Sequence, residues 1–488
     1  MKKTKTLLCL ALALLMLLLP ACAGPAKPEE TAGPAAPSDT APDTTADPFS
    51  RPDYIAKDRY DGYEFIVLMT NLNASGDVLQ DFGALDTTTT VIEDAQFRRN
   101  ERVAEELDVK LTGITDYSSS NTGYHKVLTA NKSGDNVYDM GVIATYDAGR
   151  LAMAGELRDL SSLGFLKLEQ PWWDQNINRD VNFDGHIYFT TGDISLTTTM
   201  AMYNLVFNKD MFREKNWDMP YDTVREGKWT FDKMKEYVLQ ISEDLDGNEI
   251  MNDQDRYGFV YIKSTIIAFL GTAGEQIARV DGGEIKLTLN TERAEKAIVD
   301  FVEMTQDRDH CLNGQTNSSS AVGMFSDGKC LFRAGEHIMF HYFRDTDLDY
   351  GILPLPKLDE QQERYYTPFG GWDASFVCVP NCSEDAERTS TVMEYLAKVS
   401  RELVTPAYYE KTLVGRTVRD EESTDMITIE INNRVFDVGY IYDIGGYKNA
   451  IEQLSSGFST RFSSMIAAYS RKAEKDVAKA NAQLFSGN

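Results

Sequence analysis

Basic side chains are scarce in this sequence of 488 residues. The 49 Lys and Arg residues stand against 76 Asp and Glu residues, giving a formal net charge of −27. Phosphate backbones are bound by clustered Lys and Arg, so this balance excludes a broad nucleic-acid surface. Hydrophobic residues still make up 42% of the chain, enough for packed cores and too many for a largely disordered protein. At roughly 100–200 residues per domain, the length predicts two or more domains.

Recognisable catalytic motifs are also missing. The sequence contains neither a Gly-x-Ser-x-Gly elbow nor a phosphate-binding Walker loop. Only five His residues are present, and His337 and His341 enclose Ile-Met-Phe without the Glu of a metalloprotease helix. The two carboxylates of a glycosidase cannot be recognised by inspection among 76 acidic residues. We therefore expect a binding protein that requires no cofactor. An exported carbohydrate-active enzyme is the alternative.

A long apolar run occurs only once, from Leu7 to Leu19. It is too short for a membrane span, which needs roughly 20 residues, and it follows the positive charges of Lys2, Lys3 and Lys5. This pattern is typical of a signal peptide, which we place over residues 1–21.

The apolar run ends in Leu19-Pro20-Ala21-Cys22. Small residues around a Cys at this place resemble the lipobox of bacterial lipoproteins. The resemblance implies cleavage before Cys22, acylation of Cys22 with palmitate-type chains, and an anchor on the extracytoplasmic side of the cell membrane. An ordinary secretory cleavage near Ala23 is the alternative. Residues 22–50 are rich in Pro, Ala and Thr, cannot bury a core, and are predicted to form a disordered tether.

Cysteines are few in the rest of the chain: Cys311, Cys330, Cys378 and Cys382. Export permits disulfides, and Cys311 with Cys330 is one candidate pair. Cys378 and Cys382 lack a second pair of matching spacing, so they do not indicate a zinc site. Buried free thiols are the alternative, and the sequence leaves both open.

Strands and helices are predicted to alternate in the first half of the body. Short apolar runs predict strands, and apolar positions at helical spacing predict the helices between them. The predicted elements are a strand over 63–69, a helix over 94–107, a strand over 109–114, a helical stretch from Val127, and a strand over 140–144. This alternation predicts an α/β fold with a mostly parallel sheet.

The pattern restarts after residue 203. We expect a strand over 205–207, a helix capped by Thr230, a strand from Tyr350 that stops at Pro354, a helix capped by Ser383, and a long amphipathic helix between Phe458 and Val477.

Several segments, in order, resemble the extracellular solute-binding proteins of ABC importers, in the family 1 group that includes maltose-binding protein. The segments are Ala95–Val103, Tyr138–Leu160, Tyr203–Phe212, Lys228–Met234, Tyr350–Lys357, Tyr408–Glu410 and Arg419–Glu422.

The resemblance implies a two-lobed fold of the periplasmic-binding-protein type II, with a hinge and an interlobe cleft. One lobe would comprise residues 51–202 and 352–400, and the other 203–351 and 401–488. The chain would cross between lobes near residues 197–203, 350–357 and 400. The implied function is capture of a small solute, a sugar or oligosaccharide, for an ABC permease in the cytoplasmic membrane. A ligand-binding subunit of a sensor kinase is a further alternative.

Sugars present apolar faces and a rim of hydroxyls, so their sites combine aromatic rings with hydrogen-bonding side chains. Trp372 and Asp373 follow two glycines, which let the backbone approach a ligand. The resemblance places this loop near the cleft. Tyr146, Asp147 and Asn71 follow predicted strands, where ligands of open α/β sheets bind. Trp172 and Trp173 are further candidates, with packing against the protein interior as the alternative.

A run of oxygen-bearing side chains resembles an EF-hand calcium loop. Asp244, Asp246, Asn248 and Asp255 stand at loop positions one, three, five and twelve, with the Ile250 carbonyl at seven. Glu249 replaces the usual Gly, and Asp255 is shorter than the usual Glu. We therefore expect either a structural Ca²⁺ site or a solvated acidic turn.

Overall fold

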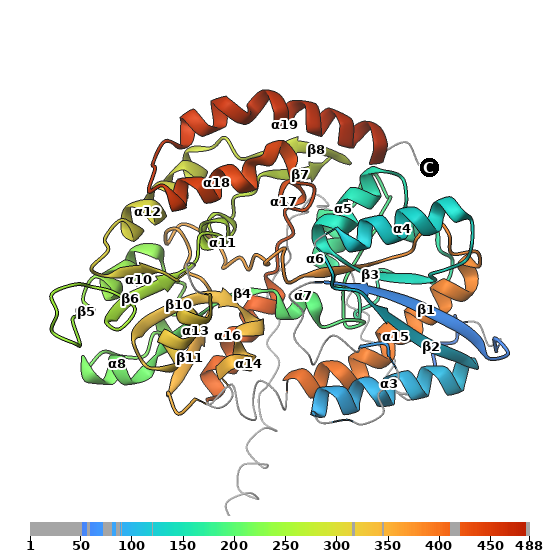
Figure 1. Cartoon of the computed structure of the whole chain (residues 1–488), viewed down its shortest axis with the longest axis horizontal. Helices are drawn as coiled ribbons and strands as arrows, with labels where there is room; N and C mark the ends of the chain where they lie inside the picture. Colours follow the sequence, from blue (N-terminus) through green and yellow to red (C-terminus); the bar gives the residue numbers. More distant parts are fainter. Residues whose placement is uncertain are drawn as a thin grey trace, which may run out of the picture. The chain divides into compact units, whose positions relative to one another are not determined.

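Two separate β-sheets organise the part of the chain that the structure describes (Figure 1). The structure is a computed structural model that describes residues 51–488 except 56–58, 72–80, 84–87, 89, 120, 315–317, 344–345, 410–419 and 485–488. The predicted signal peptide, Cys22 and the tether lie outside the described residues. Residues 51–488 group into one unit by their contacts.

The first sheet has four strands in the order β12-β3-β1-β2. β1 (Tyr63–Thr70) runs parallel to β2 (Val109–Thr115) and to β3 (Met140–Ala144), while β12 (Ser375–Cys378) is antiparallel to β3. Most of β1 and β3 is buried, as expected for central strands covered on both faces.

Helices cover both faces of this sheet (Figure 1). α4 (Thr122–Ser133) and α5 (Thr145–Met153) lie on one face, and α3 (Val91–Leu107) packs beside α15 (Ala386–Pro406) on the other. A reciprocal capping box starts α3, because Glu93 N–H donates to Thr90 Oγ1 and Thr90 N–H donates to the Glu93 carboxylate. η1 (Leu160–Ser162) and α6 (Gln175–Asp180) follow α5 in the chain.

The second sheet has the order β11-β4-β10-β6-β5, with β9 also paired to β6. Its strands are β4 (Tyr203–Asn208), β5 (Ser242–Glu243), β6 (Arg256–Tyr261), β9 (Cys311–Asn313), β10 (Cys330–Glu336) and β11 (Tyr350–Leu353). The accompanying helices are α8 (Lys209–Glu214), α9 (Tyr221–Arg225), α10 (Phe231–Val238), α11 (Thr265–Thr272), α12 (Glu292–Thr305), α13 (Ser318–Ser326), η3 (His337–Met339), α14 (Phe340–Phe343) and α16 (Glu421–Asn432).

Three connections carry the chain between the sheets. The first leads through α7 (Thr197–Met200) into β4, the second joins β11 to β12, and the third joins α15 to α16, which packs on β11. The first two connections are hydrogen-bonded to each other, because Tyr203 N–H donates to Pro368 O and Gly370 N–H donates to Ala201 O. The segment that follows α16 bonds to the second connection, since Thr367 N–H donates to Asn433 O. The predicted lobe boundaries stay a prediction.

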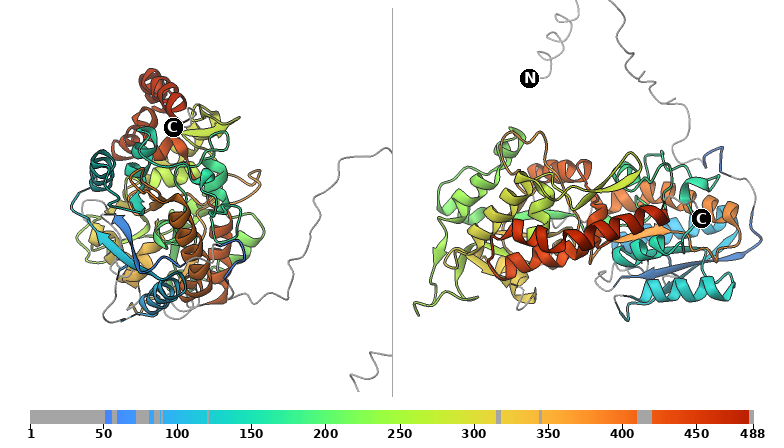
Figure 2. Two further views of the ribbon diagram at one scale, coloured as in Figure 1. Left: turned by 90° about the vertical axis from the view of Figure 1, so that its right-hand side faces the viewer. Right: turned by 90° about the horizontal axis from the view of Figure 1, so that it is seen from above.

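The C-terminal region packs against elements that accompany the first sheet and elements that accompany the second. It comprises α17 (Val438–Ile441), η5 (Ile444–Gly446), α18 (Tyr447–Ser456) and α19 (Phe462–Leu484). α19 contacts the hairpin strand β8 (Glu284–Leu287), which pairs with β7 (Ala278–Asp281), and its far end contacts α5 (Figure 2). There the Tyr188 hydroxyl donates to Leu484 O at 2.9 Å.

The structure confirms the α/β fold and the predicted strands, and it corrects the starts of two helices, α15 and α19. Ser383 does not cap α15; Asp385 does, accepting from Arg388 N–H at 2.9 Å, while Ser383 Oγ bonds to Thr389 Oγ1. Asp385 directly precedes the first helical residue, whereas Ser383 stands too far upstream to reach the first turn's amides. α19 begins at Phe462, so Phe458 lies before it.

The four cysteines of the body are buried free thiols. No helix within the described ranges combines the length and apolarity needed to cross a bilayer.

Candidate functional site

An exposed tryptophan marks a cluster of side chains contributed by elements around both sheets. Trp372 precedes β12 and is 45% exposed, whereas the other tryptophans are buried or half-buried. Its ring stands edge-on to Tyr146 of α5, with 5.5 Å between centroids. Tyr146 in turn stands 5.8 Å from Tyr440 of α17. The structure therefore brings the predicted residues Trp372 and Tyr146 together and adds Tyr440.

Gly370 and Gly371 are required by the space around this loop. A Cβ at Gly370 would lie 2.6 Å from Glu336 Oε1, and one at Gly371 would lie 2.7 Å from the Tyr146 hydroxyl. The Gly371 N–H donates to the Tyr440 hydroxyl at 3.1 Å. The double glycine thus lets the backbone before Trp372 pass between a carboxylate and two tyrosines.

A buried lysine completes the aromatic part of the cluster. Lys448, in the first turn of α18, is 7% exposed. Its Nζ lies 4.5 Å from the Tyr146 ring centroid and 4.7 Å from the Trp372 ring centroid, within cation–π range of both. Nζ also lies 3.4 Å from the Tyr146 hydroxyl. Burial lowers the pKa of Lys448.

Two carboxyl groups lie on the other side of the loop. Burial raises the pKa of Asp373 well above its usual value, and the charge of Glu336 raises it further. Burial also raises the pKa of Glu336, while the charge of the buried Arg333 opposes that rise. The two groups repel each other when both are ionised, so ionisation of Glu336 disfavours ionisation of Asp373. The site therefore offers both hydrogen-bond donors and acceptors.

Asn71 and Asp147 have structural partners. Asn71 Nδ2 donates to Asp373 O at 2.7 Å and to Ser375 Oγ at 2.9 Å, which supports the loop beneath Trp372. Asp147 is buried, accepts from Tyr124 N–H at 3.0 Å and pairs with Arg150 at 3.5 Å. Asn71 therefore supports the cluster from behind, and Asp147 joins α4 to α5.

Trp172 and Trp173 pack against one buried acid. Their indole N–H groups donate to the two oxygens of Glu394, at 3.1 and 2.8 Å. Both also line a cavity of about 350 Å³ that Asp174, Asp193, Arg401 and Arg434 share. A second cavity of about 380 Å³ is lined by Arg179, Arg279, Arg364 and Tyr366. Neither lining includes Trp372.

Sequence reasoning missed Tyr440, Lys448, Glu336 and Tyr203. A usable signal was present for Lys448, because Gly445-Gly446-Tyr447 repeats the Gly-Gly-aromatic pattern of Gly370-Gly371-Trp372. Glu336 ends β10 and Tyr203 begins β4, where the two strands pair directly.

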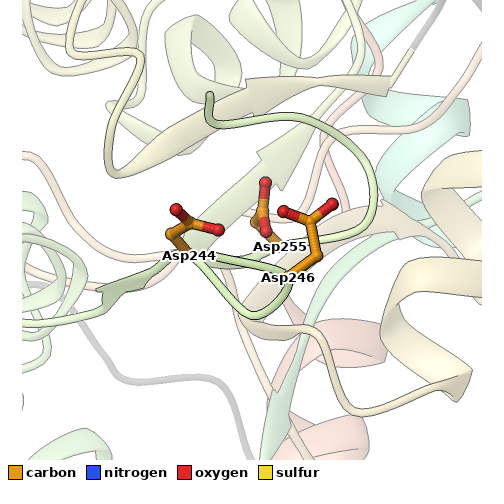
Figure 3. A group of neighbouring side chains, drawn as sticks. All are labelled: Asp244, Asp246 and Asp255. Carbon is orange, nitrogen blue, oxygen red and sulfur yellow. The ribbon is translucent and has the colours of Figure 1, made fainter. Parts of the chain in front are cut away.

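The predicted calcium loop lies between β5 and β6, and it gathers three carboxylates (Figure 3). Ligand oxygens of Asp244, Asp246 and Asp255 all lie within 4.8 Å of one another. Backbone amides hold them: Glu249 N–H donates to Asp244 at 2.7 Å, and Leu245 N–H donates to the buried Asp255 at 3.0 Å. Asn248 Oδ1 accepts from Ile250 N–H at 2.7 Å, and Ile250 O accepts from Asn252 Nδ2 at 2.8 Å.

Solved structures show where else this fold occurs. A cyclo/maltodextrin-binding protein complexed with maltotetraose has 12% identity, covers 86% of this chain and 98% of its own, with a TM-score of 0.57. An ABC transporter solute-binding protein from Thermotoga lettingae bound with α-D-tagatose has 14% identity, covers 86% and 100%, with a TM-score of 0.55. An ABC substrate-binding protein from Listeria monocytogenes in complex with cycloalternan has 13% identity, covers 87% and 98%, with a TM-score of 0.52.

No family model matches the chain, and no curated protein matches it by sequence. The structural likeness establishes the fold of ABC solute-binding proteins over most of the chain.

Proposed function

We propose that the protein is the solute-binding component of an ABC importer and captures a sugar or oligosaccharide. The observation that carries this proposal is the cluster around Trp372, where an exposed aromatic ring stands beside carboxyl groups, tyrosines and a lysine. An aromatic ring offers a surface for the apolar face of a sugar, and the polar groups are partners for its hydroxyls. The fold, and the sugars and polyols in the similar structures, agree with it.

Ligand capture is proposed to occur by closure of two lobes. Trp372, Asp373 and Tyr146 come from elements of the first sheet, and Glu336 and Tyr203 from strands of the second. A ligand that touches both sets favours the closed state, because only closure provides all of the contacts. The three connections between the sheets would serve as the hinge, since a few residues there can absorb the rotation.

Titration of the purified protein against a panel of sugars and oligosaccharides tests the proposal. We expect a saturable thermal shift with at least one sugar, and Trp372→Ala is expected to weaken its binding by about 2 kcal/mol, or roughly 30-fold. Trp217→Phe, a change outside the cluster, is the matched control and should bind as the wild type does. A panel without any binder would contradict the proposal.

We propose further that the ligand leaves the protein unchanged. The similar structures that we compared are binding proteins. Chromatography of a bound oligosaccharide after prolonged incubation should recover it intact, whereas hydrolysis or elimination products would indicate an enzyme.

Membrane attachment is proposed to depend on Cys22, with an ABC permease as the partner that receives the solute. Mass spectrometry of the N-terminal peptide from the host should show an acylated Cys22, and Cys22→Ala should release the protein from the membrane fraction. An unmodified N-terminus near Ala23 would contradict lipidation.

We also propose a structural Ca²⁺ site in the loop between β5 and β6. Asp244, Asp246, Asn248 and Asp255, with the Ile250 carbonyl, are an all-oxygen set, which hard cations prefer. Three of these carboxylates already lie within one ion's reach of each other. The ion would reduce their mutual repulsion and hold the loop.

A further inference from the structure

Lys448 is a buried ammonium group that no carboxylate contacts as an ion pair in the described part of the chain. Among the residues that the structure describes, it forms no ion pair; Glu452, on the same helix, pairs with Lys263 at 3.4 Å instead. Its ammonium group contacts the Tyr146 hydroxyl and lies over the ring faces of Tyr146 and Trp372. A buried charge of this kind is costly unless an opposite charge joins it.

Glu452 and Asp443 act on Lys448 by their charges and oppose the lowering of its pKa by burial, but neither forms an ion pair with it. Glu452 is compensated by Lys263, and Glu336 lies near the buried Arg333. Asp373 shares its surroundings with Glu336, and burial raises the pKa of both carboxyls. The first turn of α18, which carries Lys448, contains no acidic residue and has no side-chain cap. In the described part of the chain, Lys448 therefore faces Tyr146 and Trp372 without a carboxylate in ion-pair contact, although the chain as a whole carries −27.

We propose that the ligand of this site is an anionic sugar, and that its negative group binds Lys448 while a sugar ring stacks on Trp372. This inference rests on the proposed function and narrows its ligand class. The ammonium has three donor hydrogens, and the contact to Tyr146 occupies one, so others remain for a carboxylate or sulfate oxygen. The exposed Trp372 face beside it leaves a direction from which a ligand can enter.

Matched pairs of sugars that differ only in charge test this inference. Isothermal titration would compare digalacturonate with galactobiose, and a glucuronosyl-glucose disaccharide with cellobiose. A sulfated galactobiose would be compared with digalacturonate and with galactobiose. We expect the anionic member of at least one pair to bind at least tenfold tighter, because a charge-assisted hydrogen bond is roughly twice as strong as a neutral one. Raising the salt concentration should narrow that difference. Tighter binding of the carboxylate-bearing or of the sulfate-bearing sugar shows which anionic group the site prefers.

Lys448→Gln should remove the preference for the anionic member of each pair, because Gln keeps a hydrogen-bond donor but carries no charge. Lys110→Gln makes the same charge change at an exposed lysine of β2 and should preserve the preference. Lys448→Arg keeps the positive charge and is expected to retain part of the preference for the anionic sugar.

Two results separate failure of this inference from failure of the proposed function. Neutral sugars that bind as tightly as their anionic partners, or a preference that survives Lys448→Gln, would overturn the inference and leave sugar capture standing. Absence of binding by every sugar, neutral or anionic, would overturn the proposed function itself.

Discussion

At the scale of single residues, a buried pair joins η3 to α16. His337 Nε2 lies 2.6 Å from Glu430 Oε2, and both side chains are fully buried. Burial lowers the pKa of His337 from 6.5 to about 3 and raises the pKa of Glu430 well above 4.5. The pair is therefore expected to hold one proton at neutral pH, on Glu430, which donates to the neutral imidazole.

The raised pKa of Glu430 predicts how stability depends on pH. Its contribution is fully present below pH 4.5, the unfolded value, and is lost as the pH rises toward the folded value. Glu430→Gln keeps a hydrogen-bond donor without the titration. Relative to the wild type, this variant should gain unfolding free energy as the pH rises above 4.5, by at most about 1.4 kcal/mol per pH unit. Urea unfolding at several pH values measures the difference.

The control is Glu421→Gln on the exposed side of the same helix, which should follow the wild type at every pH. A constant difference between Glu430→Gln and the wild type as the pH rises above 4.5 would show that Glu430 is ionised in the folded protein.

Some residues of the Trp372 cluster could be predicted because a local sequence pattern marks them, and others could not. Trp372 and Asp373 were predicted from two preceding glycines, and Tyr146 from its position at the end of a strand. Lys448 and Tyr440 belong to short helices near the C-terminus, where spacing alone does not say which residue faces the first sheet. Trp172 and Trp173 stay a prediction, because an adjacent aromatic pair looks the same in sequence whether it stacks on a ligand or packs, and both indoles donate to Glu394.

At the scale of elements, the start of α15 can be tested directly. Asp385 accepts from Arg388 N–H, and Ser383 bonds to a side chain instead. Asp385→Ala should lower the unfolding free energy by about 1 kcal/mol, the usual loss for an N-cap. Ser383→Ala should cost less, since it removes no helix cap. Equal losses from the two variants, measured by urea unfolding, would argue against this assignment.

The loop between β5 and β6 predicts a response to calcium. If the ion binds, an excess of Ca²⁺ over a chelator should raise the melting temperature, with about 2.7 kcal/mol of stabilisation at a concentration one hundred times Kd. Asp244→Asn removes a ligand charge and should weaken this response at least tenfold in Ca²⁺ concentration.

Asp253→Asn is the matched control, because Asp253 lies in the same loop but outside the carboxylate group. It should respond to Ca²⁺ as the wild type does. A melting temperature that is the same in Ca²⁺ and in chelator would show that the loop is a solvated acidic turn held by its backbone amides.

Strands were the elements best predicted from sequence. β1 and β3 are short apolar runs bounded by polar residues, a pattern that burial on both faces imposes. Helix ends were predicted less well, because several polar residues precede α15 and only geometry selects Asp385 as its cap. The short crossing segments carry no periodic pattern, and the family resemblance indicated them.

At the scale of the whole molecule, two of the connections between the sheets bond to each other, and the segment after α16 bonds to one of them. Backbone hydrogen bonds at Tyr203, Gly370 and Thr367 tie these three segments together. Side chains of the Trp372 cluster come from elements on both sides of these segments. Sequence order alone could suggest this arrangement only through the resemblance, because no local pattern reports that distant segments pair.

This arrangement predicts that ligand binding makes the protein more compact. A sugar that contacts Trp372 from one side and Glu336 from the other stabilises the closed state by its additional contacts there. Small-angle X-ray scattering should show a smaller radius of gyration when the tightest-binding sugar of the panel is saturating. Trp372→Ala at the same sugar concentration should keep the radius of the free protein and reach the compact state only at a higher concentration, about 30-fold. Saturation in titration with no change in the radius would show that the sugar binds without lobe closure, and the hinge at the three connections would then have no part in capture.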